Sequence, residues 1–307
     1  MGGTAVTAVV VTWNRRSLLV ECLDALAAQS RPIDRVVVVD NASTDGTPDL
    51  LASRAEPLDV IRLTANTGGA GGFAAGLASA LQADTDAVWL LDDDTIPEPD
   101  ALAELVRARE TYPGAAVPAL VASRVVWTDG REHPMNTPRT RPRATPKERD
   151  AAAAVGCRPV RSASFVSALV DAEAARSEGL PMADYFLWND DFEYTTRLLR
   201  HRVGLFCPAS VVVHKTKAFG STDVDPGERF YFEVRNKAWM FTRSRSLSTQ
   251  EKVLYGAATL NRWAFTVVDS GDRGVLLHGL RRGLSDARRP PRPTARVLGE
   301  AGFELDA

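Results

Sequence analysis

Strand–helix alternation is the feature that most constrains how the first hundred residues can fold. Continuous β-rich runs occupy residues 5–12, 35–40, 60–63 and 87–91, and helical patterns lie between them. Apolar runs without polar alternation are typical of strands that are covered on both faces. Strands of this kind joined by helices build a parallel sheet. We therefore predict an α/β fold with a mostly parallel sheet flanked by helices.

Polar residues stand where these strands end. Thr12, Asp40, Asn66 and Asp92 each fall at the carboxyl end of one predicted strand. Because ligands of parallel sheets bind beyond the carboxyl ends of the strands, four separate loops are expected to converge on one crevice.

Three carboxylates, Asp92, Asp93 and Asp94, directly follow the apolar run that ends at Leu91. Like charges packed together are costly unless a cation neutralises them, and an Asp-x-Asp pair offers the oxygen donors that Mg²⁺ or Mn²⁺ prefers. The alternative is a solvated acidic turn before the helix that starts near Asp100.

A glycine-rich loop spans residues 66–73. Gly69, Gly71 and Ala74 match the dinucleotide fingerprint, which would indicate an NAD enzyme, although that fingerprint normally follows the first strand of its unit. The glycines also suit a tight turn with close helix–sheet packing. A third interpretation places the loop and the following helix N-terminus near a nucleotide diphosphate.

Bulk composition excludes several classes of protein. The chain has 307 residues, 45% hydrophobic and 25% charged, which suits one large α/β domain, alone or with an appendage. A net charge of −2 gives no argument for nucleic-acid binding. We expect no signal peptide and no membrane span. Three cysteines without metal-ligand spacing predict reduced thiols and a cytoplasmic location.

Residues 128–159 are rich in Pro, Arg and Thr, which indicates a long surface segment, either mobile or a binding lid. His133 lies in this segment and is expected to be a solvated loop histidine.

A second acidic cluster, Asp190 and Asp191, opens a helical pattern. Asp190 with Glu193 three residues later resembles a capping box. Asp191 would then project about 100° around the helix from Asp190 and could face a cleft as a general base. Trp188 and Tyr194 would supply aromatic platforms for a sugar.

His214 directly follows another apolar run, and a basic helical segment covers residues 229–236. A histidine that ends a strand is usually structural, but here it could complete a metal site. Beyond Ser248 the pattern is helical and aromatic, followed by an arginine-rich stretch over residues 281–296. This part is either a solvated tail or a set of amphipathic helices on an anionic membrane face.

Taken together, these segments resemble the family-2 glycosyltransferases of the GT-A fold. The matching motifs run in the expected order over about residues 5–240: VVVTWNR, VVVVDNASTDGT, NTGGAGGF, WLLDDD, FLWNDDFEY, His214 and YFEVRN. The chain looks most like actinobacterial galactofuranosyl- and rhamnosyltransferases of cell-envelope polysaccharide synthesis. In the galactofuranosyltransferase pattern Trp directly precedes the Asp pair, whereas here Asn189 intervenes, and Phe232 replaces the second tyrosine of the Tyr-Tyr-x-x-Arg-Asn element.

The resemblance implies an inverting, metal-dependent transfer from a UDP- or dTDP-sugar to a lipid-linked or oligosaccharide acceptor. Asp191 would be the base, with Asp190 beside it, and Asp92, Asp94 and His214 would hold Mn²⁺ or Mg²⁺. The expected nucleotide-sugar site comprises Thr12, Asn14, Arg16, Asp40, Asn66, Gly72, Asp92 and Asp93. The expected acceptor site comprises Trp188, Glu193, Tyr194, Arg235 and Asn236.

UDP-galactofuranose is the first choice of donor and dTDP-rhamnose the second. We expect a catalytic domain over residues 1–240, with a nucleotide-binding half (1–100) and an acceptor-binding half (101–240), and a helical extension with a basic tail over 241–307. A nucleotidyltransferase and a non-catalytic nucleotide-sugar-binding scaffold are the alternatives. Association with the inner face of the plasma membrane and a homo-oligomeric state stay open.

Overall fold

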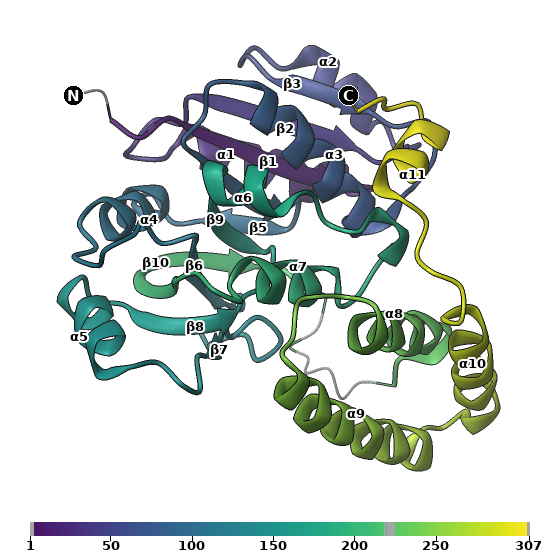
Figure 1. Ribbon diagram of the computed structural model, residues 1–307. Coiled ribbons are helices and arrows are strands. Elements are labelled where there is room, and N and C mark those ends of the chain that lie inside the picture. Colours follow the sequence, from purple (N-terminus) through teal and green to yellow (C-terminus); the bar gives the residue numbers. More distant parts are fainter. Residues whose placement is uncertain (1–2, 218, 220–224, 306–307) are drawn as a thin grey trace.

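The computed structural model describes residues 3–217, 219 and 225–305 (Figure 1). These residues form one ten-stranded mixed sheet in the order β3-β2-β1-β4-β9-β6-β10-β8-β7, with β5 paired to β10. The strands are β1 (Val6–Thr12), β2 (Arg35–Asp40), β3 (Asp59–Arg62), β4 (Ala87–Asp92), β5 (Thr95–Pro97), β6 (Leu120–Val126), β7 (Arg139–Thr140), β8 (Arg158–Ser162), β9 (Ser167–Asp171) and β10 (Gly204–His214).

The first half of the sheet is parallel, as the sequence predicts. β1 pairs in parallel with β2 and β4, and β2 pairs in parallel with β3. The register sets Thr12 opposite Asp40 and Val11 opposite Asp92. The carboxyl ends of the three strands therefore meet at one edge, which brings their terminal polar residues together.

The second half mixes directions. β9 runs antiparallel to both β4 and β6, while β10 runs parallel to β6 and antiparallel to β5 and β8. β6 is continuous through Ser123 and Arg124, although its pairing with β10 is irregular. The irregularity falls in its neighbour, where the register shifts between Cys207 and Val211. Pro208 lies within this shift, as expected for a residue that cannot donate to a strand ladder.

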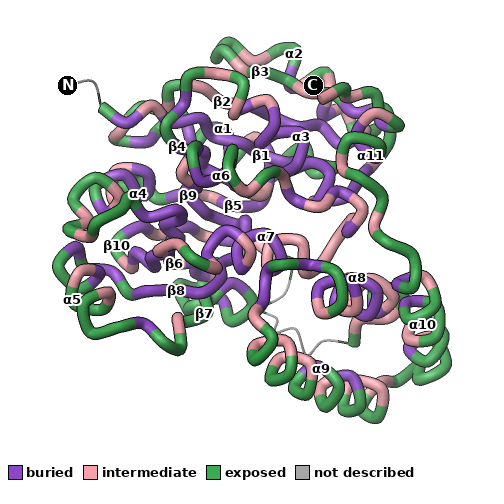
Figure 2. The backbone as a smooth tube through the Cα atoms, viewed as in Figure 1, coloured by how far each residue is buried: buried purple, intermediate pink, exposed green. Residues whose placement is uncertain are grey.

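Helices cover both faces of the sheet. The residues of β1 alternate between two cores: Val9 and Val11 point to one, Ala8 and Val10 to the other. Buried residues concentrate along the strands (Figure 2), and burying the side chain of each Val contributes about 1.5–3 kcal/mol. One core is covered by α3 (Gly68–Gln82), α6 (Ala172–Glu178), α7 (Asp190–Leu198) and α11 (Thr294–Glu300), and the other by α1 (Arg16–Ala27), α2 (Thr47–Ser53), α4 (Ala101–Glu110) and α5 (Pro146–Ala154).

The glycines of α3 allow it to lie close to β1. A Cβ at Gly72 would lie 2.4 Å from Val11 Cγ1, and one at Gly76 would lie 2.3 Å from Val9 Cγ1. Side chains at these positions would push the helix away from the sheet. Close helix–sheet packing therefore accounts for Gly72 and Gly76, which lie outside the fingerprint of Gly69, Gly71 and Ala74.

Three C-terminal helices form a separate lobe beside the sheet (Figure 1). The helices α8 (Phe230–Thr242), α9 (Thr249–Asp269) and α10 (Arg273–Asp286) pack around Phe230, Val234, Trp263 and Leu276. Two short 3-10 turns, η1 (Ala183–Tyr185) and η2 (Gly227–Arg229), precede α7 and α8. Within the described ranges, no helix combines the length and the apolar character that crossing a bilayer requires.

The arginine-rich stretch does not end as a free tail. After α10 the chain returns to the sheet, and α11 places Val297, Leu298 and Ala301 in the core next to α3. Thr64 N donates a 2.9 Å hydrogen bond to Ala301 O. The end of the C-terminal extension is therefore part of the same core as the first strands.

Candidate active site

The first acidic cluster lies at the carboxyl end of β4. Asp92 is partly exposed, whereas Asp93 and Asp94 are 4% and 3% exposed. Asp93 accepts hydrogen bonds from Thr12 Oγ1 (2.8 Å) and from Arg15 Nη1 (3.2 Å). Asp93 therefore connects β4 to the loop after β1, and Asp92 and Asp94 on either side of it are left to face the crevice.

Strand pairing brings His214 to this cluster from more than a hundred residues away. β5 follows the aspartates immediately and pairs with β10 in a register that sets Thr95 opposite His214. Lys215 N also donates to Asp94 O (2.9 Å). Asp92, Asp94 and His214 each offer one ligand atom, and these atoms lie within 4.8 Å of one another.

The donor set of these three residues fits a divalent cation. Asp94 Oδ1 is buried and accepts no hydrogen bond of good geometry, although His214 Nε2 lies 3.1 Å away. Burial and the neighbouring Asp94 raise the pKa of Asp92 to about 7. Carboxylate oxygens and an imidazole nitrogen suit Mn²⁺ and tolerate Mg²⁺ less well. The site therefore has a buried oxygen without a partner and an excess of negative charge, both of which a cation would relieve.

Residues of the long surface segment orient His214. Its Nδ1 lies 2.9 Å from Asn136 Oδ1, which leaves Nε2 directed at Asp94. The His133 ring lies 5.2 Å from the His214 ring, and its Nε2 lies 3.0 Å from Thr216 Oγ1. His133 is fully buried, so the prediction of a solvated loop histidine is wrong. The segment folds over His214, and this tertiary packing has no local sequence signal.

Arg15 is a charged residue of the site that sequence reasoning missed. Its guanidinium forms ion pairs with both Asp93 and Asp94. Burial alone would lower the pKa of Arg15, but the negative charges of Asp94, Asp93 and Asp92 outweigh burial and raise it. Its position in the loop after the first strand is the only signal in the sequence.

The remaining residues of the predicted nucleotide site lie in the loops after β1, β2 and β3. Asp40 is buried, and its Oδ2 accepts no hydrogen bond from the described residues, while Arg62 Nε lies 3.8 Å away. Asn14 Oδ1 accepts from Thr44 N, and Asn66 Oδ1 accepts from Gly68 N (both 2.7 Å). Arg16 is exposed at the start of α1. Gly72 differs from them, because it packs against β1 inside α3.

The second acidic cluster follows a strained loop. Phe186, Trp188 and Asn189 all have positive φ (64°, 66° and 65°), which costs L residues roughly 1–3 kcal/mol each. The glycine-rich loop of residues 66–73 holds this strained loop in place, because Phe186 O accepts a hydrogen bond from Ala70 N (3.1 Å). A Cβ at Gly68 would lie 2.0 Å from Phe186 O, so only glycine fits there.

Asn236 and Arg235 hold the same loop from the other side. Asn236 Nδ2 lies 2.8–2.9 Å from the carbonyl oxygens of Tyr185, Leu187 and Trp188. Arg235 Nη2 donates to Asp184 O (2.7 Å) and Tyr185 O (3.1 Å). Both side chains are buried. Both residues therefore hold this loop, and Arg235 also lines a cavity beside it with Phe186 and Phe232. Their place in an acceptor site stays a prediction.

Asp190 and Asp191 open α7 beyond this loop. The N-cap is Asn189, whose side chain donates to Glu233 Oε2 (2.7 Å), so the predicted capping box between Asp190 and Glu193 is not formed. Burial and the adjacent Asp191 raise the pKa of Asp190 well above its usual range. Burial also raises the pKa of Asp191, against the 2.6 Å hydrogen bond from Phe192 N. Both residues are partly exposed, so Asp191 is accessible.

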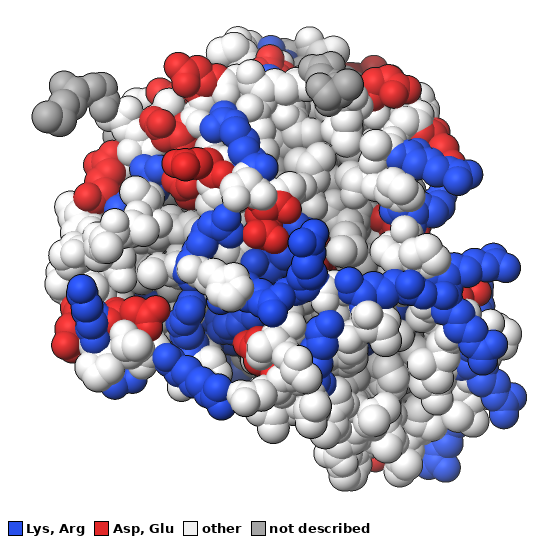
Figure 3. All heavy atoms as spheres, viewed as in Figure 1, with Lys and Arg blue, Asp and Glu red and all other residues white. Residues whose placement is uncertain are grey.

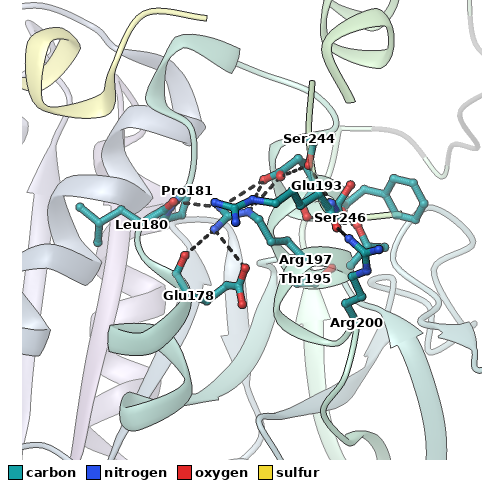
Figure 4. Close-up of polar contacts among 12 residues, drawn as sticks. Glu178, Leu180, Pro181, Glu193, Thr195, Arg197, Arg200, Ser244 and Ser246 are labelled. Atoms are coloured by element: carbon teal, nitrogen blue, oxygen red, sulfur yellow. Dashed lines mark hydrogen bonds and ion pairs between the residues drawn. The ribbon is translucent and has the colours of Figure 1, made fainter. Parts of the chain in front are cut away.

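Two residues of the predicted acceptor site point into the core. Glu193 is 1% exposed and pairs with Arg197 (3.0 Å), and it also accepts from Ser244 Oγ (2.5 Å), as Figure 4 shows. Tyr194 is fully buried against Phe165 and Arg197. Neither side chain has a surface left for an acceptor. Trp188, by contrast, is partly exposed on the loop itself.

Sequence comparisons identify proteins similar to this chain. The family model described as "Glycosyl transferase family 2" matches residues 7–167, just over half of the chain. The chain is 29% identical to the galactofuranosyltransferase GlfT1 of Mycolicibacterium smegmatis over 280 residues, which covers 85% of this chain and 90% of that protein. It is also 29% identical to GlfT1 of Mycobacterium tuberculosis, covering 88% of this chain and 92% of that protein.

Solved structures with low sequence identity share the fold. Staphylococcus aureus TarS (residues 1–349), solved in complex with UDP-GlcNAc, superposes with a TM-score of 0.63 at 18% identity, covering 96% of this chain and 83% of that one. The mannosyltransferase PcManGT of Pyrobaculum calidifontis, solved with GDP-Man and Mn²⁺, gives 0.57 at 22% identity, covering 98% and 80%. The predicted GT-A architecture with C-terminal helices is confirmed.

Proposed function

Because the chain belongs to glycosyl transferase family 2, we propose that it moves a sugar from a nucleotide-sugar donor to a glycan or lipid-linked acceptor, with inversion at the anomeric carbon. The observation that carries this proposal is the meeting of two acidic clusters at one edge of the sheet. A Cβ at Gly69, at the start of the helix that follows β3, would lie 4.0 Å from Asp190 Oδ2, so the second cluster lies beside the loop after β3 at this edge. The first cluster offers ligands for a cation, and the second offers a base.

Each cluster has a part in the proposed reaction. Asp191 takes the proton of the acceptor hydroxyl as that oxygen attacks the anomeric carbon from the side opposite the leaving nucleoside diphosphate. Asp92, Asp94 and His214 would hold a divalent cation, and a bound Mn²⁺ or Mg²⁺ supplies positive charge against the negative charge that builds on the leaving group. Thr12, Asp40 and the neighbouring loop residues Asn14, Arg16 and Asn66 bind the nucleotide. A single displacement needs no covalent nucleophile.

For the donor we propose UDP-galactofuranose first and dTDP-rhamnose second. Similarity to two proteins named galactofuranosyltransferase over most of both chains supports the first choice. Solved relatives bind UDP-GlcNAc and GDP-Man in the same fold, which supports a nucleotide-sugar donor in general.

A thermal-shift panel of nucleoside diphosphates and nucleotide sugars, each with and without Mn²⁺, tests the donor site. The expected result is a metal-dependent rise in Tm with UDP or dTDP ligands, because a ligand that binds only the folded state stabilises it. Nucleoside diphosphate release together with a glycosylated product confirms the reaction. Release of pyrophosphate would indicate a nucleotidyltransferase, binding without turnover would indicate a scaffold, and a shift with NAD alone would overturn the proposal.

We also propose that the C-terminal lobe contacts an anionic lipid surface. The outer face of α9 exposes large apolar side chains, with Val253, Leu254, Leu260, Phe265 and Val268 each 57–69% exposed. Lys and Arg gather over the adjacent α10, whereas α9 is largely uncharged (Figure 3). An apolar helix face beside arginines suits the boundary between anionic headgroups and acyl chains. On this basis the lobe of α8, α9 and α10 attaches the catalytic sheet to the surface, whereas α11 belongs to the core of that sheet.

Vesicle co-sedimentation tests the lipid surface. The wild-type chain is expected to sediment with phosphatidylglycerol vesicles at low salt and not with phosphatidylcholine vesicles, and L254E/F265E is expected to stay in the supernatant. A wild-type chain that sediments with neither kind of vesicle would overturn this assignment. A dimer in ultracentrifugation that the same double variant dissociates would assign the face to a second copy of the chain.

A further inference from the structure

Two cations meet at the side chain that follows the proposed base. Phe192 comes directly after Asp191, and the Lys237 Nζ lies 4.6 Å from the centre of its ring. The Arg139 guanidinium carbon lies 5.1 Å from the same ring and 5.9 Å from the ring of Tyr255. The two cations come from β7 in the long surface segment and from α8, which are about a hundred residues apart.

Neither cation has an anionic partner among the described residues. Lys237 is only 5% exposed, yet within the described ranges its ammonium makes no hydrogen bond and no ion pair. Arg139 is exposed, and its guanidinium likewise has only aromatic contacts in that part of the chain. Other cations nearby are occupied: Arg262 pairs with Glu233 (2.9 Å), and Arg143 donates to Gln250 (2.8 Å).

A buried ammonium without a partner is costly. Burial lowers the pKa of Lys237 to about 8, although the charges of Glu233 and Asp191 raise it. Asp191 is the nearest carboxylate of the proposed reaction, and it forms no ion pair with either cation in the described structure. An anion placed between Arg139 and Lys237 would offset the cost of burial and would lie next to the base.

We propose that Arg139 and Lys237 bind an anionic oxygen group of the acceptor, a phosphate or a carboxylate, beside Asp191. This inference rests on the proposed function, because it gives the acceptor-binding half of that same site its chemical specificity. Guanidinium and ammonium groups are the usual ligands of such oxygens. Phe192 and Tyr255 form the apolar side of the subsite, against which the uncharged part of the acceptor packs.

The competing explanation is that the two cations only offset the charge of Asp191. In that case their removal would change the ionisation of Asp191 but would not remove a binding site for added anions. Direct binding of a small anion in the absence of divalent metal therefore separates the two explanations.

Calorimetric titration of methyl phosphate and of acetate, in EDTA, tests the subsite. We expect the wild-type chain to bind at least one of the two anions. The preferred anion shows whether the acceptor group is a phosphate or a carboxylate. R139Q and K237M are each expected to weaken binding by roughly tenfold or more, whereas R143Q, which removes the same charge from the same segment, is expected to change little. R139Q is the decisive variant because Arg139 is exposed and its loss should not affect folding.

Two outcomes would overturn the inference: no binding of either anion, or binding that R139Q and K237M leave unchanged. Mn²⁺-dependent UDP binding serves as the separate control. If UDP binds normally while the anion results fail, only the subsite is wrong, whereas absence of nucleotide binding means that the proposed function itself fails.

Discussion

The two acidic clusters have similar sequences and different surroundings. Asp92–Asp94 carry their counter-charges on contacting side chains, because Arg15 forms ion pairs with two of the three and His214 lies beside Asp94. Asp190 and Asp191 have no such pair among the described residues, and burial raises the pKa of both. In the first cluster His214 and Arg15 lower the pKa of Asp94, although burial raises the pKa of Asp92 to about 7. In the second cluster no ion pair among the described residues opposes burial. The comparison teaches that contacting side chains, and not the Asp-Asp sequence, decide how each carboxyl ionises.

The largest expected effect comes from removing the proton acceptor. D191N should lower turnover by roughly a hundredfold or more while leaving Mn²⁺-dependent UDP affinity nearly unchanged, because the amide cannot take a proton. Nucleoside diphosphate release with an envelope lipid extract as the acceptor source measures turnover, and calorimetry measures affinity. Near-normal turnover would remove Asp191 from the mechanism.

A substitution in the first cluster, Asp92–Asp94, tests its proposed role in binding the metal. D94A should abolish the Mn²⁺-dependent part of UDP affinity, because it removes one of the carboxylates proposed to ligate the metal. Calorimetry with Mn²⁺ and with EDTA measures the difference. D49A, an exposed aspartate on α2, is the matched control and should behave as the wild type. Equal affinities in D94A and the wild type under both conditions would contradict the assignment.

A smaller effect is expected when the loop before Asp190 and Asp191 loses a hydrogen-bond donor. N236A leaves the buried carbonyls of Tyr185, Leu187 and Trp188 without their shared donor, which should cost about 1–3 kcal/mol of stability. We expect kcat to fall roughly tenfold with UDP affinity unchanged, because the loop orients Asp190 and Asp191 but not the nucleotide. Denaturant unfolding and steady-state kinetics measure the two effects. A loss of stability with unchanged kcat would give Asn236 a purely structural role.

The smallest expected effect is a pH dependence of methyl phosphate binding at Lys237. The Lys237 ammonium must be protonated to attract methyl phosphate, and its pKa is about 8, so affinity should fall as the pH rises from 7 to 9.5. The charged groups that act on it are Asp191, Glu233, Arg139 and Arg262, and the arginines stay charged throughout this range. K237R should keep its affinity to higher pH. A flat profile for the wild type would exclude Lys237 as a ligand.

Local pattern was sufficient to predict the sheet and its loops. The unbroken apolar runs of β1, β2 and β4 require burial on both faces, and parallel pairing then brings Thr12, Asp40 and Asp92 to one edge. Local pattern was less reliable for single side chains. Glu193 and Tyr194 read as parts of a binding surface, yet the turn of α7 directs both into the core, because an acidic or aromatic side chain carries no sign of which face will be covered.

Contacts between distant segments were decided only by tertiary structure. His214 reaches Asp94 because β5 pairs with β10, and Asn236 reaches the loop before Asp190 because α8 packs against it. Arg139 reaches Phe192 because the long surface segment folds over α7. These contacts depend on the packing of whole helices and strands. The packing energy is spread over many side chains, so the sequence around the contacting residues does not indicate which residues will meet. The residue types of the chain therefore determined which chemistry was available, and the packing of its elements determined which of those residues share a site.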